Sequence, residues 1–241
     1  MSTPSTRVQL AQHEPLRSAP AELAWTADDL WQRSVWRMGL SPAILDELRA
    51  LSAGEAVDEA WLERWQPGRP TPAIAALAAE IADEVFGGSG VVWLRGPELP
   101  QRFTAAEWKL LYLALGCAIG QPMEHYGRLY EVKDLGSSYK EKAIPVSQTR
   151  AETGFHTDST ARERLPDIVA LLCIQPGQQG GESQVCSAAA AHEELRADRP
   201  DLLRALYQEF VRDIVTPGYE RGEGPLLENR FPVFSQGFFG R

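Results

Sequence analysis

The segment from Gly154 to Ser187 constrains the fold more than any other part of the chain, because it joins metal-binding residue types to a long apolar run. His156 and Asp158 stand two residues apart within it. In an extended strand, side chains two apart project to the same face, so we expect this imidazole and this carboxylate to point to one place. Such a pair provides two of the three ligands of a 2-His-1-carboxylate site, which leaves positions open on iron(II) for oxygen chemistry.

The residues after this pair predict a buried strand and a turn. Residues 168–174 form a continuous apolar run whose length is typical of a strand buried on both faces. The glycine-rich stretch 176–181 predicts a turn, and residues 182–185 resume an extended segment that brings in the hydroxyl of Ser183. These features together are more specific than the His-x-Asp spacing by itself.

From about Gly90 onward, the chain resembles the iron(II)- and 2-oxoglutarate-dependent dioxygenases of the taurine dioxygenase type. The resemblance rests on four motifs: His156-x-Asp158, Pro166-Asp167 before the apolar run, Gly180-Gly181-Glu182-Ser183, and Ser187 before an Ala-rich helix. It implies that His156 and Asp158 bind the iron and that Ser183 hydrogen-bonds a carboxylate of 2-oxoglutarate. It also implies an α+β fold with a double-stranded β-helix (jelly-roll) core and flanking helices.

The same resemblance implies a reaction and its cofactors, iron(II) and 2-oxoglutarate. In that reaction 2-oxoglutarate yields succinate and CO2 while a C–H bond of a small-molecule substrate is oxidised. The carboxylate of Asp158 favours hydroxylation over halogenation, because related halogenases leave that position empty for a halide.

The second iron-binding histidine and the 2-oxoglutarate-binding arginine of the family have no counterpart that we can identify. The histidines are His13, His125, His156 and His192, and none follows residue 192. We therefore expect these 241 residues to be an incomplete enzyme whose C-terminal strands are missing. We expect His125 to cap a turn, and His192 to face solvent or satisfy a local hydrogen bond. Either could complete the triad only through an unusual path.

Two other functions compete with the dioxygenase. One is a catalytically silent fragment or relative that acts as a binding module, which the missing ligands would explain. The other is a nucleotide-binding α/β protein that uses the glycine turn before the Ala-rich helix. This turn has neither a Gly-x-Gly-x-x-Gly pattern nor a following Lys, and Glu182 would repel phosphate, so a nucleotide site is disfavoured.

Composition predicts the setting in which the chain works. A length of 241 residues, with 44% hydrophobic and 24% charged residues, is typical of a soluble globular domain. The net charge of -9 disfavours nucleic acid as a partner. No apolar stretch is long enough for a membrane span or a signal peptide, so we expect a cytoplasmic protein with no membrane partner. Three scattered cysteines, Cys117, Cys173 and Cys186, indicate buried reduced thiols.

Local signals predict three regions and their elements. We expect a flexible arm over residues 1–24, a helical region over 25–88, and the incomplete jelly-roll domain over 89–241. Capping and apolar patterns predict helices at 42–51, 71–87, 104–118, 188–192 and 199–210, and one holding Trp61 and Trp65. Strands are predicted at 90–96, 128–132, 211–215 and 231–234. The polar stretch 134–155 is a candidate lid whose Lys140, Lys142 and Arg150 could meet a substrate carboxylate.

Overall fold

The computed structural model describes residues 16–52, 54–96, 103–123, 127–136, 146–158, 166–211 and 230–235. It divides into two compact units, and each is described by itself. The first unit comprises Met1–Thr26, Glu131–Asp167 and Gln184–Arg241, and the second comprises Ala27–Tyr130 and Ile168–Ser183. The region boundaries at residues 24 and 88 stay predictions.

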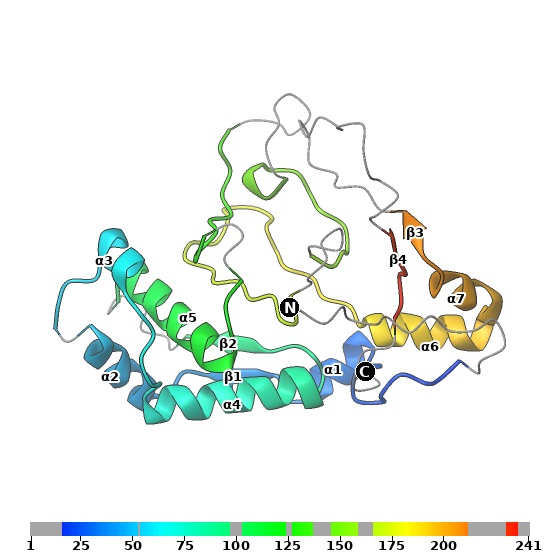
Figure 1. Ribbon diagram of the computed structural model, residues 1–241, viewed down its shortest axis with the longest axis horizontal. Coiled ribbons are helices and arrows are strands. Elements are labelled where there is room, and N and C mark those ends of the chain that lie inside the picture. Colours follow the sequence, from blue (N-terminus) through cyan, green and yellow to red (C-terminus); the bar gives the residue numbers. More distant parts are fainter. Residues whose placement is uncertain are drawn as a thin grey trace, which may run out of the picture. The chain divides into compact units, whose positions relative to one another are not determined.

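Helices dominate the second unit, and local capping explains where most of them begin. They are α1 (Ala27–Gln32), α2 (Pro42–Leu51), α3 (Glu59–Arg64), α4 (Pro72–Gly87) and α5 (Ala105–Ile119) (Figure 1). The Ser41 hydroxyl accepts a hydrogen bond from the Ile44 amide at the start of α2. Thr104 and Glu107 form a capping box at the start of α5. Helices α2 and α5 confirm the predictions made from capping signals, and α4 confirms the helix predicted at 71–87.

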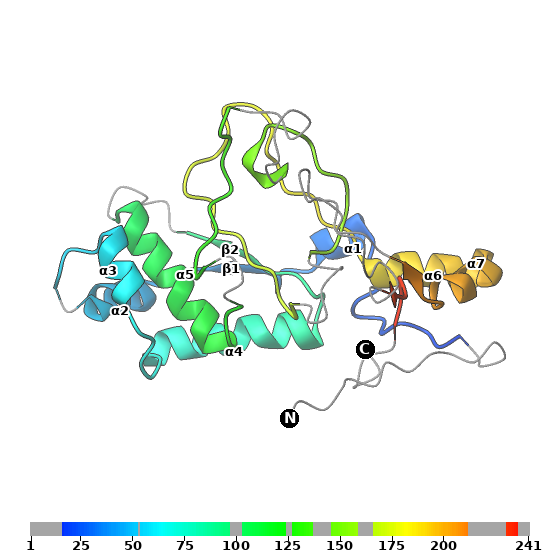
Figure 2. The ribbon, with the colours of Figure 1, turned by 45° about the horizontal axis from the view of Figure 1, so that its top comes forward.

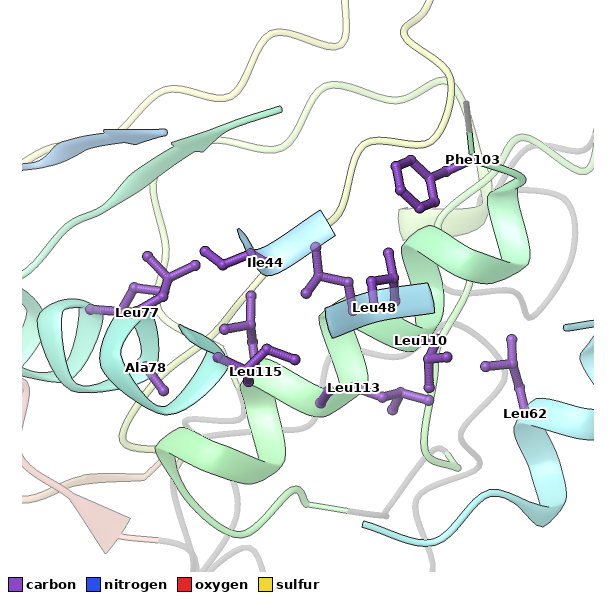
Figure 3. Packing of buried hydrophobic residues seen from close by; sticks show 13 residues of the cluster. Ile44, Leu48, Leu62, Leu77, Ala78, Phe103, Leu110, Leu113 and Leu115 are labelled. Carbon is purple, nitrogen blue, oxygen red and sulfur yellow. The ribbon is translucent and has the colours of Figure 1, made fainter. Parts of the chain in front are cut away.

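The apolar faces of α2, α3, α4 and α5 share one hydrophobic core. Figure 3 shows side chains of this core, among them Leu48 of α2, Leu77 of α4 and Leu110 of α5. Leu110 is fully buried, at 0% exposure. Burial of a Leu or Ile side chain contributes about 1.5–3 kcal/mol. Leu111 and Leu115 of α5 also lie in this core.

A two-stranded parallel sheet completes the second unit. Strand β1 (Arg37–Gly39) lies beside β2 (Trp93–Arg95) (Figures 1 and 2). The two strands are parallel, with Met38 opposite Leu94. Met38 and Leu94 pack against the core, whereas the flanking residues are exposed. The prediction of a buried strand over residues 90–96 was therefore wrong in length and in burial. A single hydrophobic core covers only one face of a two-stranded sheet, so the other face stays exposed.

The apolar run Ile168–Ile174 is an extended segment without strand pairing among the described residues, which corrects the prediction of a buried strand. Ile168 is half-buried, and the side chains from Val169 to Ile174 are exposed, with Leu171 at 74%. A strand buried on both faces needs hydrogen-bonding neighbours at its edges, and no described segment provides them. Cys173 is consequently exposed and not buried, and Cys186 is exposed as well. The run is tethered by the Tyr112 hydroxyl, which donates to the Ala170 carbonyl at 2.7 Å.

The glycine turn after this run forms as predicted. Gly180 and Gly181 have φ angles of 70° and 80°, a left-handed conformation that favours glycine. A Cβ atom on Gly177 would lie 3.0 Å from the Gly180 carbonyl oxygen, so the turn is also closely packed. By contrast, residues 128–132, predicted as a strand, contain none, because no described segment pairs with them.

The first unit holds α6 (Ala188–Asp198), α7 (Pro200–Leu206) and the antiparallel pair β3 (Phe210–Val211) and β4 (Arg230–Phe231). Among its described residues, the candidate lid contains the 3-10 turn Val146–Gln148. Ser187 caps α6 by accepting from the Ala190 amide at 2.8 Å. Helix α7 ends at Leu206, and not at Phe210 as predicted, because Phe210 pairs with Phe231 in the sheet.

The mixture of helices and strands agrees with the predicted α+β class. The described residues form two two-stranded sheets and no closed sheet. None of the helices in the described part of the chain is both long and apolar enough to cross a bilayer.

Candidate metal centre

The local backbone of the first unit brings His156 and Asp158 together. His156 Nε2 lies 3.3 Å from Asp158 Oδ1. The segment is not a strand, because the chain bends at Phe155 and turns at Asp158. The predicted mechanism of alignment, strand alternation, was therefore wrong, although the two side chains do face one another.

A hydrogen bond from His156 determines which of its two ring nitrogens carries the hydrogen. His156 Nδ1 lies 2.8 Å from the carbonyl oxygen of Gly154. A carbonyl oxygen only accepts hydrogen bonds, so Nδ1 carries the hydrogen in this contact. In a neutral imidazole, Nε2 then bears the lone pair, and this lone pair is beside the Asp158 carboxylate. Metal-binding histidines commonly donate their other N–H to a carbonyl in this way.

The pair fits a divalent metal ion by its donor types and by its spacing. Two donors at a right angle, each about 2.1 Å from an ion, are about 3 Å apart. The observed separation of 3.3 Å is close to that value. The two side chains are 54% and 50% exposed, so an ion can reach them. Within the described ranges, no third His, Cys, Asp or Glu joins the pair.

Several other predicted site residues belong to the second unit or fall outside the described residues. Ser183 belongs to the second unit, where it is exposed and follows the glycine turn. His13, His125, Lys140 and Lys142 lie outside the described residues. The contact between Ser183 and 2-oxoglutarate stays a prediction.

Arg150, which we proposed as a contact for a substrate carboxylate, pairs with Asp134 within the candidate lid. Asp134 also accepts from the Gly136 amide at 2.8 Å. The amide hydrogen bond and the Arg150 guanidinium lower the pKa of Asp134. The charge of Arg150 is therefore compensated inside its own segment.

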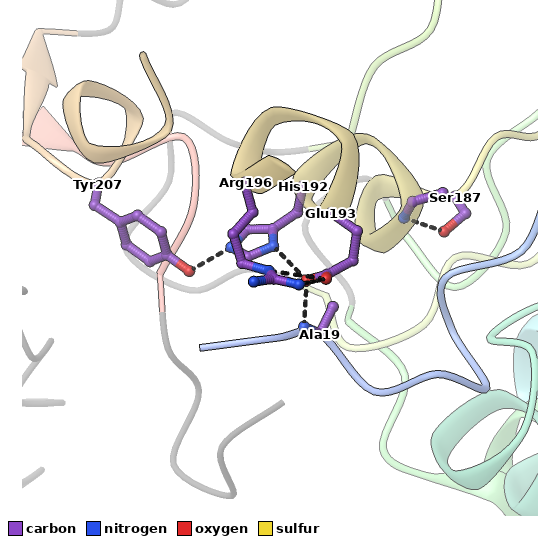
Figure 4. Close-up of polar contacts among 7 residues, drawn as sticks. Ala19, Ser187, His192, Glu193, Arg196 and Tyr207 are labelled. Carbon is purple, nitrogen blue, oxygen red and sulfur yellow. Dashed lines mark hydrogen bonds and ion pairs between the residues drawn. The ribbon is translucent and has the colours of Figure 1, made fainter. Parts of the chain in front are cut away.

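A buried polar cluster on α6 was not predicted as such. His192 is only 6% exposed, so the expectation of a solvent-facing side chain was wrong and that of a local hydrogen bond was right. Its Nε2 lies 3.0 Å from the Tyr207 hydroxyl and its Nδ1 lies 3.2 Å from Glu193 Oε1 (Figure 4). The three-residue spacing of Glu193 and Arg196 could have indicated their ion pair, but nothing local to α6 identifies Tyr207 as a partner.

Glu193 is the most strongly perturbed group of this cluster. The Arg196 guanidinium holds the pKa of Glu193 at about 2, against an ordinary value of 4.5, and outweighs the opposing effect of burial. The amide of Ala19 also donates to Glu193, at 2.7 Å. The Ser187 hydroxyl donates to the Leu23 carbonyl, so hydrogen bonds join residues 19–23 both to α6 and to its N-cap. This cluster ties segments of the first unit together.

Comparison with known proteins decides the family. The family described as "Taurine catabolism dioxygenase TauD, TfdA family" matches residues 45–233, well over half of the chain. The chain belongs to this TauD/TfdA family. The match includes His156, Asp158 and Ser183, and it confirms the resemblance found in the sequence.

Two curated relatives of this TauD/TfdA chain extend the comparison. One is FR-33289 synthase of Streptomyces rubellomurinus, 28% identical over 89% of this chain and 62% of its own length. Another is the taurine hydroxylase-like protein SAT17 of Stachybotrys chartarum, 25% identical over 86% of this chain and 54% of its own length. The chain thus spans less than two thirds of the length of these relatives. No solved structure matches it.

Proposed function

We propose that this chain belongs to an iron(II)- and 2-oxoglutarate-dependent oxygenase that oxidises a C–H bond of a small organic substrate. Its family, and relatives named as a synthase and as taurine hydroxylase-like, support this proposal. The jelly-roll core is the fold that family membership implies, and we propose it for the complete domain. Iron, when bound, would supply the activation of oxygen.

The facing pair of His156 and Asp158 is the observation that carries the proposal. The Gly154 carbonyl orients the imidazole so that its lone pair and the carboxylate oxygen, 3.3 Å apart, are both available as ligands. His156 and Asp158 would hold the iron, and Ser183 would donate its hydroxyl hydrogen to a carboxylate of 2-oxoglutarate. The retained carboxylate of Asp158 supports hydroxylation over halogenation.

Metal binding by the purified chain tests this assignment. Iron(II) is titrated anaerobically into the metal-free protein, and bound iron is measured by equilibrium dialysis. We expect His156→Ala and Asp158→Ala each to weaken iron binding by about tenfold or more, because each removes one of the two donors. Glu152→Ala is the matched control, since it removes an exposed carboxylate from the same segment.

Unchanged iron affinity in His156→Ala would show that the assignment of the pair is wrong. Adding 2-oxoglutarate and oxygen then tests whether the chain is an active oxygenase or a catalytically silent relative. Succinate production that depends on His156 supports the oxygenase. Iron binding without succinate production is expected of a catalytically silent relative and equally of an oxygenase that lacks the second iron-binding histidine and the arginine, so only succinate production decides.

A further inference from the structure

The exposed face of the β1–β2 sheet carries two arginines and a tryptophan. Side chains alternate along a strand, and the parallel register places Arg37 opposite Trp93 and Gly39 opposite Arg95. Because Met38 and Leu94 pack against the core, Arg37, Trp93 and Arg95 occupy the opposite, exposed face. The sheet therefore presents two cationic side chains on one surface of an acidic protein.

Aromatic rings hold both guanidinium groups in place. The Arg37 guanidinium carbon lies 5.5 Å from the ring centroid of Trp31 and 5.7 Å from that of Trp36. The Arg95 guanidinium carbon lies 5.2 Å from the ring centroid of Trp93. The rings of Trp36 and Trp93 are themselves stacked, with centroids 6.1 Å apart. Cation–π contacts of this kind use the face of a guanidinium and leave the N–H groups at its edge available.

Among the described residues, these N–H groups have few partners. One nitrogen of Arg37 lies 3.5 Å from the Trp31 carbonyl, at the limit of a hydrogen bond. Within the described ranges, no carboxylate forms an ion pair with Arg37 or Arg95. Four other arginines of the described chain, Arg49, Arg150, Arg196 and Arg199, do have carboxylate partners.

The space between the two arginines is open. Ser34, Arg37, Gly39, Leu40 and Arg95 contribute to the wall of an open hollow of about 510 Å³. A Cβ atom on Gly39 would have no neighbour within 4 Å, so the absence of a side chain there leaves room beside Arg95. Ser183, which belongs to the same unit, does not line this hollow.

We infer that this hollow binds a small oxyanion with two negative charges, such as a phosphoryl or dicarboxylate group, between Arg37 and Arg95. Planar guanidinium groups match the oxygen spacing of such anions and can bind them with paired hydrogen bonds. The two positive charges would be compensated by one dianion, and Ser34 offers a further hydroxyl donor at the rim. We name these residues the Arg37–Arg95 site.

Titration of the metal-free chain with inorganic phosphate, at constant ionic strength, tests the site. Tryptophan fluorescence and the Nε–Hε resonances of Arg37 and Arg95 report binding, because Trp31, Trp36 and Trp93 contact these arginines. We expect a saturable response, weakened about tenfold or more by Arg37→Gln or by Arg95→Gln. Arg37→Lys keeps the charge but loses the fork, so we expect a weakening of several-fold.

Arg49→Gln is the matched control, because Arg49 also lies over a ring, that of Phe103 at 5.0 Å, but is already paired with Asp46. It should leave phosphate binding unchanged. A parallel titration with succinate distinguishes a dicarboxylate from a phosphoryl ligand by which anion binds more tightly. The inference is overturned if neither anion gives a saturable response, or if Arg49→Gln weakens binding as much as Arg95→Gln does. Thermal unfolding of each variant verifies that it is folded. If a Gln variant does not fold, the effect of Arg37→Lys on phosphate binding is used instead.

Discussion

At the scale of single residues, the Gly154 carbonyl sets the chemistry available to His156. By accepting a hydrogen bond from Nδ1, it leaves Nε2 as the nitrogen whose lone pair can bind a metal ion beside Asp158. The sequence predicted that the two side chains meet, because their spacing is visible in it. It could not predict this carbonyl contact, because the contact depends on a bend at Phe155 that no residue type dictates.

Ser183 is expected to affect the cofactor and not the metal. Replacing it by Ala removes the hydroxyl that would donate to 2-oxoglutarate, so we expect the dissociation constant for 2-oxoglutarate to rise about tenfold. Iron binding should be unchanged, and it serves as the internal control. Calorimetric titration with 2-oxoglutarate in the presence of iron(II) measures the effect. Equal loss of both ligands would point to misfolding, and no change in either would leave Ser183 bonded to backbone or water only.

Glu193 predicts a specific pH dependence of stability. Its pKa is lowered from 4.5 to about 2 in the folded chain, so its stabilising contribution is present above pH 4.5 and is lost as the pH falls toward 2. Glu193→Gln should reduce the free energy of unfolding above pH 4.5 and flatten its fall between pH 4.5 and 2. Denaturant unfolding at several pH values measures this.

Glu194→Gln is the control for this experiment, because it removes a charge from the adjacent, exposed position of the same helix. The two variants should differ in the slope of stability against pH. If they show the same slope, the contacts of Glu193 with Arg196 and Ala19 do not stabilise the folded chain.

At the scale of elements, α4 takes its N-terminal cap from another helix. Thr71 occupies the capping position, but its side chain does not cap α4. The Glu47 carboxylate of α2 accepts from the amides of Ala73 and Ile74, at 3.0 and 3.1 Å, and from the Thr71 hydroxyl. Burial raises the pKa of Glu47, but these hydrogen bonds outweigh it and the pKa is lowered.

Glu47→Ala should therefore destabilise the chain by about 1–2 kcal/mol, the usual effect of losing a helix cap together with a favourable charge at a helix N-terminus. Asp46→Ala is the matched control. It breaks an exposed ion pair with Arg49 and should cost no more than about 0.5 kcal/mol. Urea denaturation of both variants gives the comparison, and equal effects would contradict the capping role.

Capping also explains which elements were predictable. Ser41, Thr104 and Ser187 mark helix starts through contacts within three residues, so the sequence contains the whole signal. Strands depend on partners that are distant in the chain. The run 168–174 has the composition of a central strand, but composition does not provide a neighbour, and the segment remains exposed.

At the scale of the whole molecule, that exposed run and the core of the second unit predict opposite effects of substitution on stability. Leu171 is 74% exposed, so Leu171→Lys should change the free energy of unfolding by no more than about 0.5 kcal/mol and reduce aggregation. Leu110 is fully buried, so Leu110→Ala should cost about 2–5 kcal/mol. Denaturant unfolding and light scattering measure both effects. A large loss of stability in Leu171→Lys would instead indicate that the run is a buried strand, as the jelly roll of the family requires.

The parallel pairing of β1 with β2 has a consequence for the order in which the chain folds. Helices α2, α3 and α4 all lie between the two strands in the sequence. Local helices form early, whereas the pairing of β1 with β2 closes a long loop, and the entropy lost on closing it precedes the contacts that compensate for it. Arg37 and Arg95 would therefore meet late, after the helices have packed. Anion binding at their site would then be acquired near the end of refolding, and would report that the second unit is complete.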